Sequence, residues 1–305
     1  MTELFRLLSY GAMSLIDEII ERQIDVALME DIGPGDITTL AGIEPKKISA
    51  EITAKSDGVL AGIPLIAAAF KKLDVDAVIK AFRHDRDSFK RGDIIAEIKG
   101  NSRAILTAER TALNFLGHLS GIATLASEFV KKVEGTNAKI LDTRKTTPGL
   151  RYLEKYAVTC GGGRNHRFGL YDMALIKDNH IAAAGSLTKA IKKLKEYLAG
   201  DDFKRRFNIE PGKIEIEVEI TDENQLSEAI DNGIKRLLLD NQSIEQLSAM
   251  VKKARTLSGN VLLEASGNVN LNNVRKIAET GVDLISIGAL THSAPASDFS
   301  LKVKP

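Results

Sequence analysis

The sequence is poor in cysteine, in net charge and in long apolar runs. Cys160 is the only cysteine among 305 residues, which excludes an intramolecular disulfide and a cysteine-based zinc site. The 42 basic and 41 acidic residues leave a net charge of +1, so bulk charge gives no reason to expect nucleic-acid or membrane binding. No segment approaches the roughly 18–20 apolar residues of a membrane-spanning helix, and the acidic N-terminus is unlike a secretory signal. We therefore expect a globular protein of the cytoplasm.

One stretch departs from this even balance of charge. Residues 143–180 read TRKTTPGLRYLEKYAVTCGGGRNHRFGLYDMALIKDNH and carry seven Arg and Lys residues against three acids, a net charge of +4 with histidine neutral. Three consecutive glycines lie in the middle of the stretch. A concentration of cations around a flexible turn, in a protein of almost no net charge, indicates a binding site for an anion.

The first third of the chain has the pattern of an α+β domain. Residues 14–32 space their apolar side chains like one face of a helix, and the sequence GPG then breaks the pattern. Between residues 47 and 107, short alternating runs predict the strands of a half-buried antiparallel sheet around one helical segment, PLIAAAFKKL. The last of these predicted strands is AILTA, at residues 104–108. Residues 108–134 return to a helical pattern.

After residue 137 the chain alternates between strands and helices. Six apolar runs predict strands: AKILDT, MALIKD, IEIEVEI, RLLLDN, VLLEAS and DLISIGA. Among the helices between them, one ends at Gly200, and another begins with a capping box formed by Ser243 and Gln246 and stops at Gly259. Strands joined by single helices form a parallel sheet through right-handed crossovers. The pattern is that of an α/β barrel or of an open doubly wound sheet, which periodicity alone does not distinguish.

Five of the six predicted strands end in polar or charged residues. One such residue is most often a turn or cap residue, but five charged ends in succession are harder to explain, because each charge costs solvation unless it is paired or liganded. In a barrel, the functional loops follow the carboxyl ends of the strands. The set comprises Asp142, Thr143, Arg144, Lys145, Lys177, Asp178, His180, Glu215, Glu217, Glu219, Asp240, Asn241, Glu264, Ser266, Gly267 and Asn268.

These residue types predict a strongly anionic, phosphorylated substrate. Arginine is suited to bidentate contacts with carboxylate or phosphate, and short turns of small residues such as SGN and SIGAL offer backbone N–H groups to a phosphate. Glu219 and Asp240 suit ribose hydroxyls or a metal-bound pyrophosphate, since both favour carboxylate oxygens. The cationic floor of the site would consist of Arg144, Lys145, Arg167 and Lys177.

Three other reactive residues are better explained structurally. Cys160 has no clear partner in the sequence, His84 lies in the charged surface turn RHDRD, and His118 lies on an apolar-rich helix. His166 differs from them, because two arginines flank it directly after the glycine turn. We expect His166 to be functional.

Residues 143–180 resemble the central motif of quinolinate phosphoribosyltransferase, the decarboxylating enzyme family of NAD biosynthesis. The resemblance extends from about residue 14 to 303 and includes EDIGPGDITT, ERTALNFLGHLSGIAT, EVEI, LLLDN, LEASGNVNLNNV and GVDLISIGALTHSAPASDFSLK. The central block is long and specific, whereas EVEI or LLLDN alone would mean little. Residues 1–13 extend beyond the family pattern, with Met13 as an alternative start.

The resemblance implies an α/β protein of two domains. Residues 1–130 would form an N-terminal α+β open-faced sandwich, joined by residues 292–305, and residues 131–291 an irregular α/β barrel with parallel strands. The family is a pentosyltransferase. It transfers phosphoribosyl from phosphoribosyl pyrophosphate to quinolinate with decarboxylation, giving nicotinate mononucleotide, pyrophosphate and carbon dioxide. The resemblance further implies Mg²⁺ as cofactor and a homodimer with shared active sites; the sequence leaves dimer and hexamer open.

The family motif also implies roles for the cationic residues. Arg144, His166 and Arg167 would face the two carboxylates of quinolinate. Lys145 and Lys177 would lie between the two substrates.

The remaining roles follow from the flanking motifs. Arg110, in ERTALN, would reach the active site of the neighbouring subunit, and Glu219 and Asp240 would hold the ribose and the metal–pyrophosphate group. The implied catalytic residues are Lys145, Lys177, Glu219 and Asp240, the last two also being the metal candidates. The implied substrate-binding residues are Arg110, Thr143, Arg144, Lys145, His166, Arg167, Lys177, Glu219, Asp240, Ser266, Gly267, Asn268, Ile287, Gly288 and Ala289.

Two other functions remain open at the level of the sequence. A paralogous, molybdenum-transport-associated phosphoribosyltransferase-like protein would share the fold and act on another acidic ring. A non-catalytic, phosphate-binding regulatory module would keep the fold without turnover. The complete RNHR and TRKTTPG motifs favour quinolinate over the first alternative, and the four intact catalytic residues favour turnover over the second.

Overall fold

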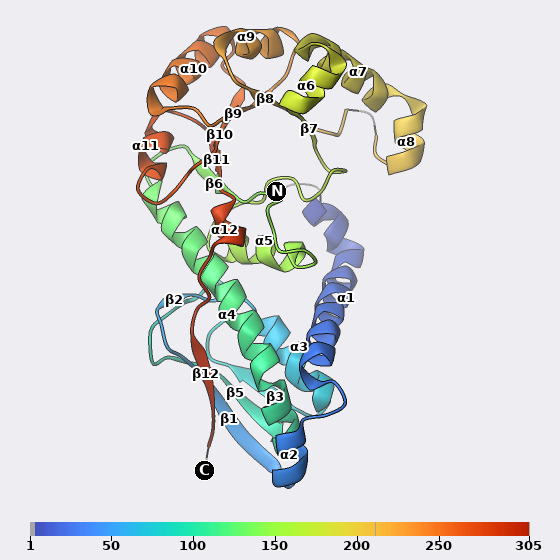
Figure 1. Cartoon of the computed structure of the whole chain (residues 1–305), viewed down its shortest axis with the longest axis vertical. Helices are drawn as coiled ribbons and strands as arrows, with labels where there is room; N and C mark the ends of the chain where they lie inside the picture. The colour runs from blue at the N-terminus through green and yellow to red at the C-terminus, as the bar shows by residue number, and fades with distance from the viewer. Residues whose placement is uncertain (1–3, 211, 305) are drawn as a thin grey trace. The chain divides into compact units, whose positions relative to one another are not determined.

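The computed structural model describes residues 4–210 and 212–304, with side chains from residue 18 onward. The chain divides into two compact units (Figure 1). The first comprises residues 1–125, 152–161 and 294–305, and the second comprises residues 126–151 and 162–293. The domain boundaries expected from the family pattern stay a prediction. None of the described helices combines the length and the apolar character that a membrane span requires.

The first unit is built on a four-stranded antiparallel sheet with the strand order β12-β1-β5-β3. Along β1, Ala50, Ile52 and Ala54 are fully buried, whereas Glu51 and Thr53 between them are partly exposed. This alternation confirms the half-buried antiparallel sheet predicted from the sequence. The elements are α1 (Leu4–Ile32), α2 (Ile37–Gly42), β1 (Lys47–Ala54), β2 (Gly58–Val59), α3 (Ile63–Leu73), β3 (Val78–Ala81), β4 (Ser88–Phe89), β5 (Ile94–Asn101), α4 (Ser102–Lys132), which continues into the second unit, α5 (Arg151–Cys160) and β12 (Phe299–Val303).

Two helices differ from the sequence prediction. The strand predicted at residues 104–108 is wrong, because α4 begins at Ser102 and contains the whole segment. Ile105 and Ala108 are buried within this helix, and a short apolar run suits a buried helix as well as a strand. Helix α1 begins at Leu4, earlier than predicted, and so includes part of the N-terminal extension; residues 1–3 lie outside the described residues.

The second unit contains a six-stranded parallel sheet with the strand order β6-β11-β10-β9-β8-β7. All six strands predicted from the sequence are present. The first strand of this unit pairs with the last, as a barrel requires, whereas a doubly wound sheet reverses its order at a switch point. Among the described residues no ladder joins β6 to β7, and only Arg164 bridges to Leu141 beside β6. The sheet is therefore that of an irregular α/β barrel, which confirms the predicted fold class.

The helices of the second unit begin and end as their sequence signals indicate. The Ser243 hydroxyl accepts a hydrogen bond from the Gln246 N–H, and the Gln246 side chain accepts one from the Ser243 N–H, which confirms the capping box. The elements are β6 (Lys139–Leu141), β7 (Ala174–Ile176), α6 (Asp178–Ala184), α7 (Leu187–Ala199), α8 (Asp201–Phe207), β8 (Ile216–Ile220), α9 (Glu223–Asp231), β9 (Arg236–Asp240), α10 (Ile244–Leu257), β10 (Leu262–Ser266), α11 (Val274–Glu279), β11 (Leu284–Ser286) and α12 (Ala289–His292).

Candidate active site

A cavity of about 450 Å³ lies at the carboxyl ends of the barrel strands. Its volume suits small-molecule ligands, and it lies where barrels of this kind carry their functional loops. Most of the implied substrate-binding residues line this one cavity. They are Thr143, Arg144, Lys145, His166, Arg167, Lys177, Asp240, Ser266, Gly267, Asn268, Ile287, Gly288 and Ala289.

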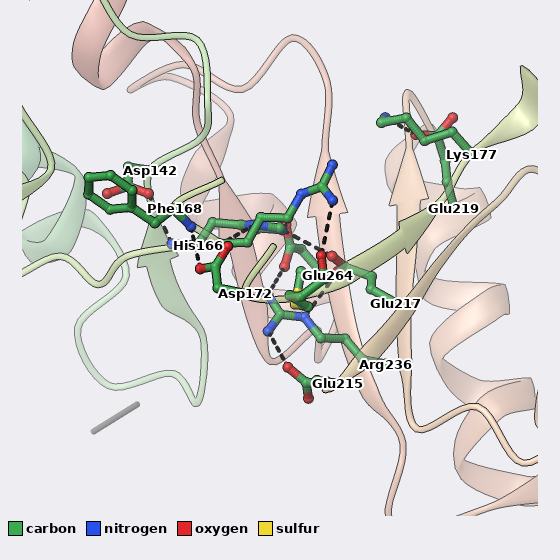
Figure 2. A network of polar contacts seen from close by, with 12 residues as sticks. Asp142, His166, Phe168, Asp172, Lys177, Glu215, Glu217, Glu219, Arg236 and Glu264 are labelled. Atoms are coloured by element: carbon green, nitrogen blue, oxygen red, sulfur yellow. Dashed lines mark hydrogen bonds and ion pairs between the residues drawn. The ribbon is translucent and has the colours of Figure 1, made fainter. Parts of the chain in front are cut away.

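Two of the implied substrate-binding residues do not line the cavity, and neither do Asp142, Asp178, His180, Glu215, Glu217 and Asn241 of the strand-end set. Glu219, at the end of β8, is not among the lining residues, but its carboxylate forms an ion pair with the ammonium group of Lys177, which does line the cavity (Figure 2). Arg110 lies on α4 within the first unit, and its role in a neighbouring site stays a prediction.

Two arginines give the cavity an anion-binding character. The buried Nε of Arg144 has no hydrogen-bond partner among the described residues. Burial and the nearby charge of Arg144 lower the pKa of Arg167, and the Arg167 guanidinium donates one hydrogen bond to the carbonyl of Met173, at 3.1 Å. Two guanidinium groups close enough to repel, one with an unused buried donor, would both be stabilised by an anionic ligand.

The loop that carries Arg144 and Lys145 is tied down by hydrogen bonds. The Thr143 hydroxyl accepts the Lys145 N–H at 3.0 Å, and the Thr291 hydroxyl donates to the Lys145 carbonyl at 2.7 Å. Arg151 donates to the Thr146 hydroxyl at 3.0 Å. The cations are therefore presented from a fixed main chain.

The turn after β10 can only be built with glycine at its centre. Gly267 has a φ of +93°, and a Cβ there would lie 2.1 Å from Oδ1 of Asn241. Asn241 donates its side-chain amide to Asp240 at 2.7 Å and accepts from the side chain of Asn268 at 3.2 Å. Asn241 thus joins the carboxylate at the end of β9 to the small-residue turn after β10.

A buried ionic network includes two of the residues that line the cavity, His166 and Glu264 (Figure 2). The imidazole Nε2 of His166 lies 3.0 Å from Glu217 and 3.3 Å from Glu264. Arg236 binds both of these carboxylates and also Glu215, at 3.0, 2.6 and 3.1 Å respectively. The carboxyl groups of Glu217 and Glu264 are fully buried; burial raises the pKa of Glu217, and the charge of Arg236 stabilises both carboxylates in part.

Two influences on His166 oppose each other. Burial lowers its pKa, but hydrogen bonds to Glu217 and Glu264 outweigh burial and raise that pKa to about 9. The Arg167 N–H, however, points at Nδ1 from 2.7 Å, where a second ring proton would have to lie. The ring is therefore neutral with its proton on Nε2, because two N–H groups cannot face each other at that distance.

Comparison with known proteins identifies the family. The model of the quinolinate phosphoribosyl transferase C-terminal domain matches residues 122–302, and that of the N-terminal domain matches residues 36–120. The chain belongs to the quinolinate phosphoribosyltransferase family.

Named relatives and solved structures agree with this membership. A probable carboxylating nicotinate-nucleotide pyrophosphorylase of Bacillus subtilis is 42% identical over 93% of this chain and 93% of its own. A chloroplastic carboxylating nicotinate-nucleotide pyrophosphorylase of Arabidopsis thaliana is 40% identical over 92% of this chain and 81% of its own. The structure of the nicotinate-nucleotide pyrophosphorylase from Francisella tularensis is 41% identical, covers 94% of this chain and 96% of its own, and superimposes with a TM-score of 0.86.

Sequence reasoning missed three residues around the site of this quinolinate phosphoribosyltransferase family member. Glu264 was noted as a polar strand end without a role, although it lines the cavity. His292 also lines the cavity, and only its place four residues after Gly288 could have drawn attention to it. Arg236 begins a strand rather than ends one, so a search of strand ends could not find it.

The structural explanations of the other reactive residues hold. His118 is hydrogen-bonded to Glu154 at 2.9 Å, as expected of a satisfied helix residue. Cys160 is buried, and burial followed by the charge of Asp85 raises the pKa of its thiol to about 11, which makes it a poor nucleophile. His84 is exposed.

Proposed function

We propose that this protein transfers the phosphoribosyl group of phosphoribosyl pyrophosphate to quinolinate and releases pyrophosphate and carbon dioxide, with nicotinate mononucleotide as product. The pair of guanidinium groups in the cavity, with one buried donor unused, carries the proposal, because it calls for a ligand with two closely spaced negative charges. The family and the relatives favour this reaction over a molybdenum-transport-associated paralogue or a regulatory module.

Quinolinate would be held by its two carboxylates. Arg144 and Arg167 would each provide a charge-assisted hydrogen bond, worth about 1.5–3 kcal/mol. Lys145 and Lys177, which also line the cavity, would lie between this dianion and the phosphorylated substrate. The Gly267 turn and the backbone at 287–289 would receive the 5-phosphate of the ribose.

The first chemical step needs charge stabilisation rather than proton transfer. The bond between the anomeric carbon and pyrophosphate breaks, so that positive charge develops on the ribose and negative charge on the leaving group. Glu219 and Asp240 would stabilise the cationic sugar, and the two lysines the departing pyrophosphate. The pyridine nitrogen attacks with its lone pair and carries no proton, which explains why the cavity needs no nucleophile–base pair.

Loss of carbon dioxide then follows from the positive charge on the ring nitrogen. The bond from the ring to the adjacent carboxylate breaks and leaves its electron pair on the ring carbon beside the pyridinium nitrogen, which stabilises it. A proton then takes the place of carbon dioxide on that carbon. The protein mainly has to hold the ring in position during this step.

Magnesium suits the carboxylates at the strand ends. Asp240 of β9 lines the cavity, and Glu219 lies on the neighbouring strand β8; magnesium prefers one or two carboxylates together with phosphate oxygens. Asp240 and Glu219 would hold the ion together with the pyrophosphate group. Bound magnesium would supply positive charge to the leaving group. Removing divalent ions with a chelator should abolish turnover, and adding magnesium back should restore it.

The direct test is a reaction with defined substrates. The protein is incubated with quinolinate, phosphoribosyl pyrophosphate and magnesium, and nicotinate mononucleotide, pyrophosphate and carbon dioxide are measured. Nicotinate, which lacks the second carboxylate, serves as the control substrate and should react far more slowly. If no nucleotide forms from quinolinate, the proposed function is wrong.

We further propose a homodimer whose active sites are shared, with Arg110 reaching the partner's quinolinate. A two-fold dimer makes two equivalent sites of this kind. Mixing inactive Arg110→Ala protein with inactive Lys145→Ala protein, under conditions that exchange subunits, places both changes in one site and leaves the other intact. Activity should return to about half per mixed dimer; if exchange is shown and no activity returns, Arg110 does not act in a neighbouring site. Location in the cytoplasm, expected from the sequence, also stays a prediction.

A further inference from the structure

Two buried carboxylates connect Arg236 with His166 in the same way (Figure 2). Glu217 contacts Arg236 Nε with Oε1, at 3.0 Å, and lies 3.0 Å from His166 Nε2 with Oε2. Glu264 contacts Arg236 Nη2 with Oε2, at 2.6 Å, and lies 3.3 Å from His166 Nε2 with Oε1. Each carboxylate therefore faces the arginine with one oxygen and the histidine with the other.

The burial of this cluster requires an explanation. The carboxyl groups of Glu217 and Glu264 are 0% exposed, and the side chains of His166 and Arg236 only 8% and 11%. Buried ion pairs seldom increase stability over well-packed apolar residues, so such a cluster at a site wall suggests a role in the site. The spacing of His166, Glu217 and Glu264 would also allow a metal ion, but the Arg236 guanidinium already supplies the positive charge between the two carboxylates.

The opposite edge of the imidazole leads into the cavity. Its Nδ1 accepts the Arg167 N–H at 2.7 Å, and Asp142 accepts the main-chain N–H of His166 at 2.9 Å. The Arg167 guanidinium lines the cavity and donates to Met173. The orientation of the His166 ring therefore determines where the main chain of Arg167 lies.

We infer that Glu217, Glu264 and Arg236 form a buried positioning unit, which acts through His166 to hold Arg167 in place for the substrate dianion. This inference rests on the proposed function of the cavity. We assign the three a positioning role rather than a catalytic one, because the carboxylates of Glu217 and Glu264 bind Arg236 and face His166; Glu264 also lines the cavity. They affect the reaction by fixing the orientation of the His166 imidazole.

Only a carboxylate can take either bridging position. Arg236 donates to each bridging side chain, and the oxygen that each turns toward the donor Nε2–H of His166 has to be an acceptor. Glutamine has one accepting oxygen and one donating NH₂ group, so it must place a donor against Arg236 or against His166. Glutamine has nearly the same shape, which makes Glu→Gln a test of hydrogen bonding rather than of packing.

Glu215 provides a matched control. It contacts the same guanidinium, at 3.1 Å, but its carboxylate is 47% exposed, whereas those of Glu217 and Glu264 are buried. Glu215→Gln should keep the quinolinate affinity within about twofold, because a half-exposed ion pair contributes little. Glu217→Gln and Glu264→Gln should weaken quinolinate binding about tenfold or more, with the KM for phosphoribosyl pyrophosphate within about twofold, as expected for residues that orient a binding group.

A double-mutant cycle then tests whether the effect passes through His166. In a His166→Ala background, Glu264→Gln should add no further loss of quinolinate affinity, because the ring it orients is absent. Calorimetry with quinolinate and thermal unfolding are measured for each folded variant. An unchanged affinity in Glu264→Gln, or an equal loss with and without His166, would overturn the inference.

One measurement on the unaltered protein covers the case in which the variants do not fold. With ¹⁵N-labelled histidine, the resonances of His166, identified by their loss in His166→Gln or by their contact with the Arg167 amide, should show a proton on Nε2 and a hydrogen-bond-accepting Nδ1. A proton on Nδ1 would remove the link to Arg167 and refute the inference. Failure of the unaltered protein to bind quinolinate would instead count against the proposed function, so the two failures are distinguishable.

Discussion

The two sheets of the molecule differ in how far their charged side chains are exposed to solvent. In the antiparallel sheet of the first unit, Glu51 and Glu97 lie on the partly exposed face beside Lys304, while the other face is apolar. In the barrel, Glu217 of β8 and Glu264 of β10 are fully buried. A glutamate beside water loses little solvation free energy on folding, whereas a glutamate buried inside a sheet loses much of it. Charge in a strand is therefore informative about function only where the structure removes it from solvent.

The largest expected effect of a single change is on turnover at the ends of β8 and β9. Glu219→Gln and Asp240→Asn should each lower kcat by about a hundredfold or more, because each removes a charge that stabilises the developing cation. Quinolinate affinity should change much less, since neither carboxylate is placed against that substrate. Steady-state kinetics at saturating substrates provides the check, and a variant with unaltered kcat would exclude that carboxylate from the chemistry.

Substrate affinity is the next most sensitive quantity. Arg144→Ala and Arg167→Ala should each weaken quinolinate binding by about ten- to a hundredfold, the loss of one charge-assisted hydrogen bond. The melting temperature should be retained or rise, because either change relieves repulsion between two guanidinium groups. Calorimetry and thermal unfolding measure the two quantities separately. Full affinity in both variants would remove these residues from the site.

In the first unit, by contrast, the sensitive positions affect stability. A Cβ added at Gly121 of α4 would lie 2.1 Å from the carbonyl oxygen of Pro295, so Gly121→Ala should destabilise the protein by about 1–3 kcal/mol. Gly42→Ala is the control, because a Cβ there meets nothing within 4 Å. Thermal unfolding would detect the difference. Equal melting temperatures for the two variants would show that the main chain near Pro295 can shift away from the added Cβ at little cost in stability.

The smallest effect is expected on the exposed face of the antiparallel sheet. Lys304→Ala removes ion pairs to Glu51 and Glu97, yet its side chain is 43% exposed and water replaces those contacts readily. The melting temperature should stay within about 1 °C of the unaltered protein. A shift of several degrees would show that the contrast between the two sheets is less sharp than described.

The strands and helices of the barrel were well predicted from the sequence because their signals are local, whereas closure of the sheet was implied only by the family resemblance. Each of the six strands is a short apolar run, and helix ends such as Ser243 and Gly200 carry their own capping chemistry. The cavity followed from the same pattern, since the carboxyl ends of parallel strands meet at one edge of the sheet. Residues far apart in sequence, such as Arg144 and Asn268, could thus be assigned to one site before the structure was known.

The contacts that the sequence could not predict depend on strand register and on which side chains share a face of the sheet. Arg236 meets Glu217 and Glu264 because it pairs with Glu217 in the ladder of β8 and β9, and nothing near Arg236 in the sequence indicates that register. Asp85 is a similar case. It was read as part of a charged surface turn, yet it accepts hydrogen bonds from the N–H groups of Gly62 and Ile63 and from the hydroxyl of Tyr156.

The order of strands in the antiparallel sheet also has a consequence for biosynthesis. β1 forms ladders with β5 on one side and with β12 on the other, and β12 is the last strand of the described chain. While a ribosome makes the barrel, the edge of β1 that awaits residues 299–303 has to stay unpaired, and an open strand edge readily joins other chains. The ribosome therefore makes most of the first unit before the barrel, but that unit can complete its sheet only after the barrel has been made. We expect nascent chains halted before β12 to aggregate or recruit chaperones, and to become protease-resistant only when that strand emerges.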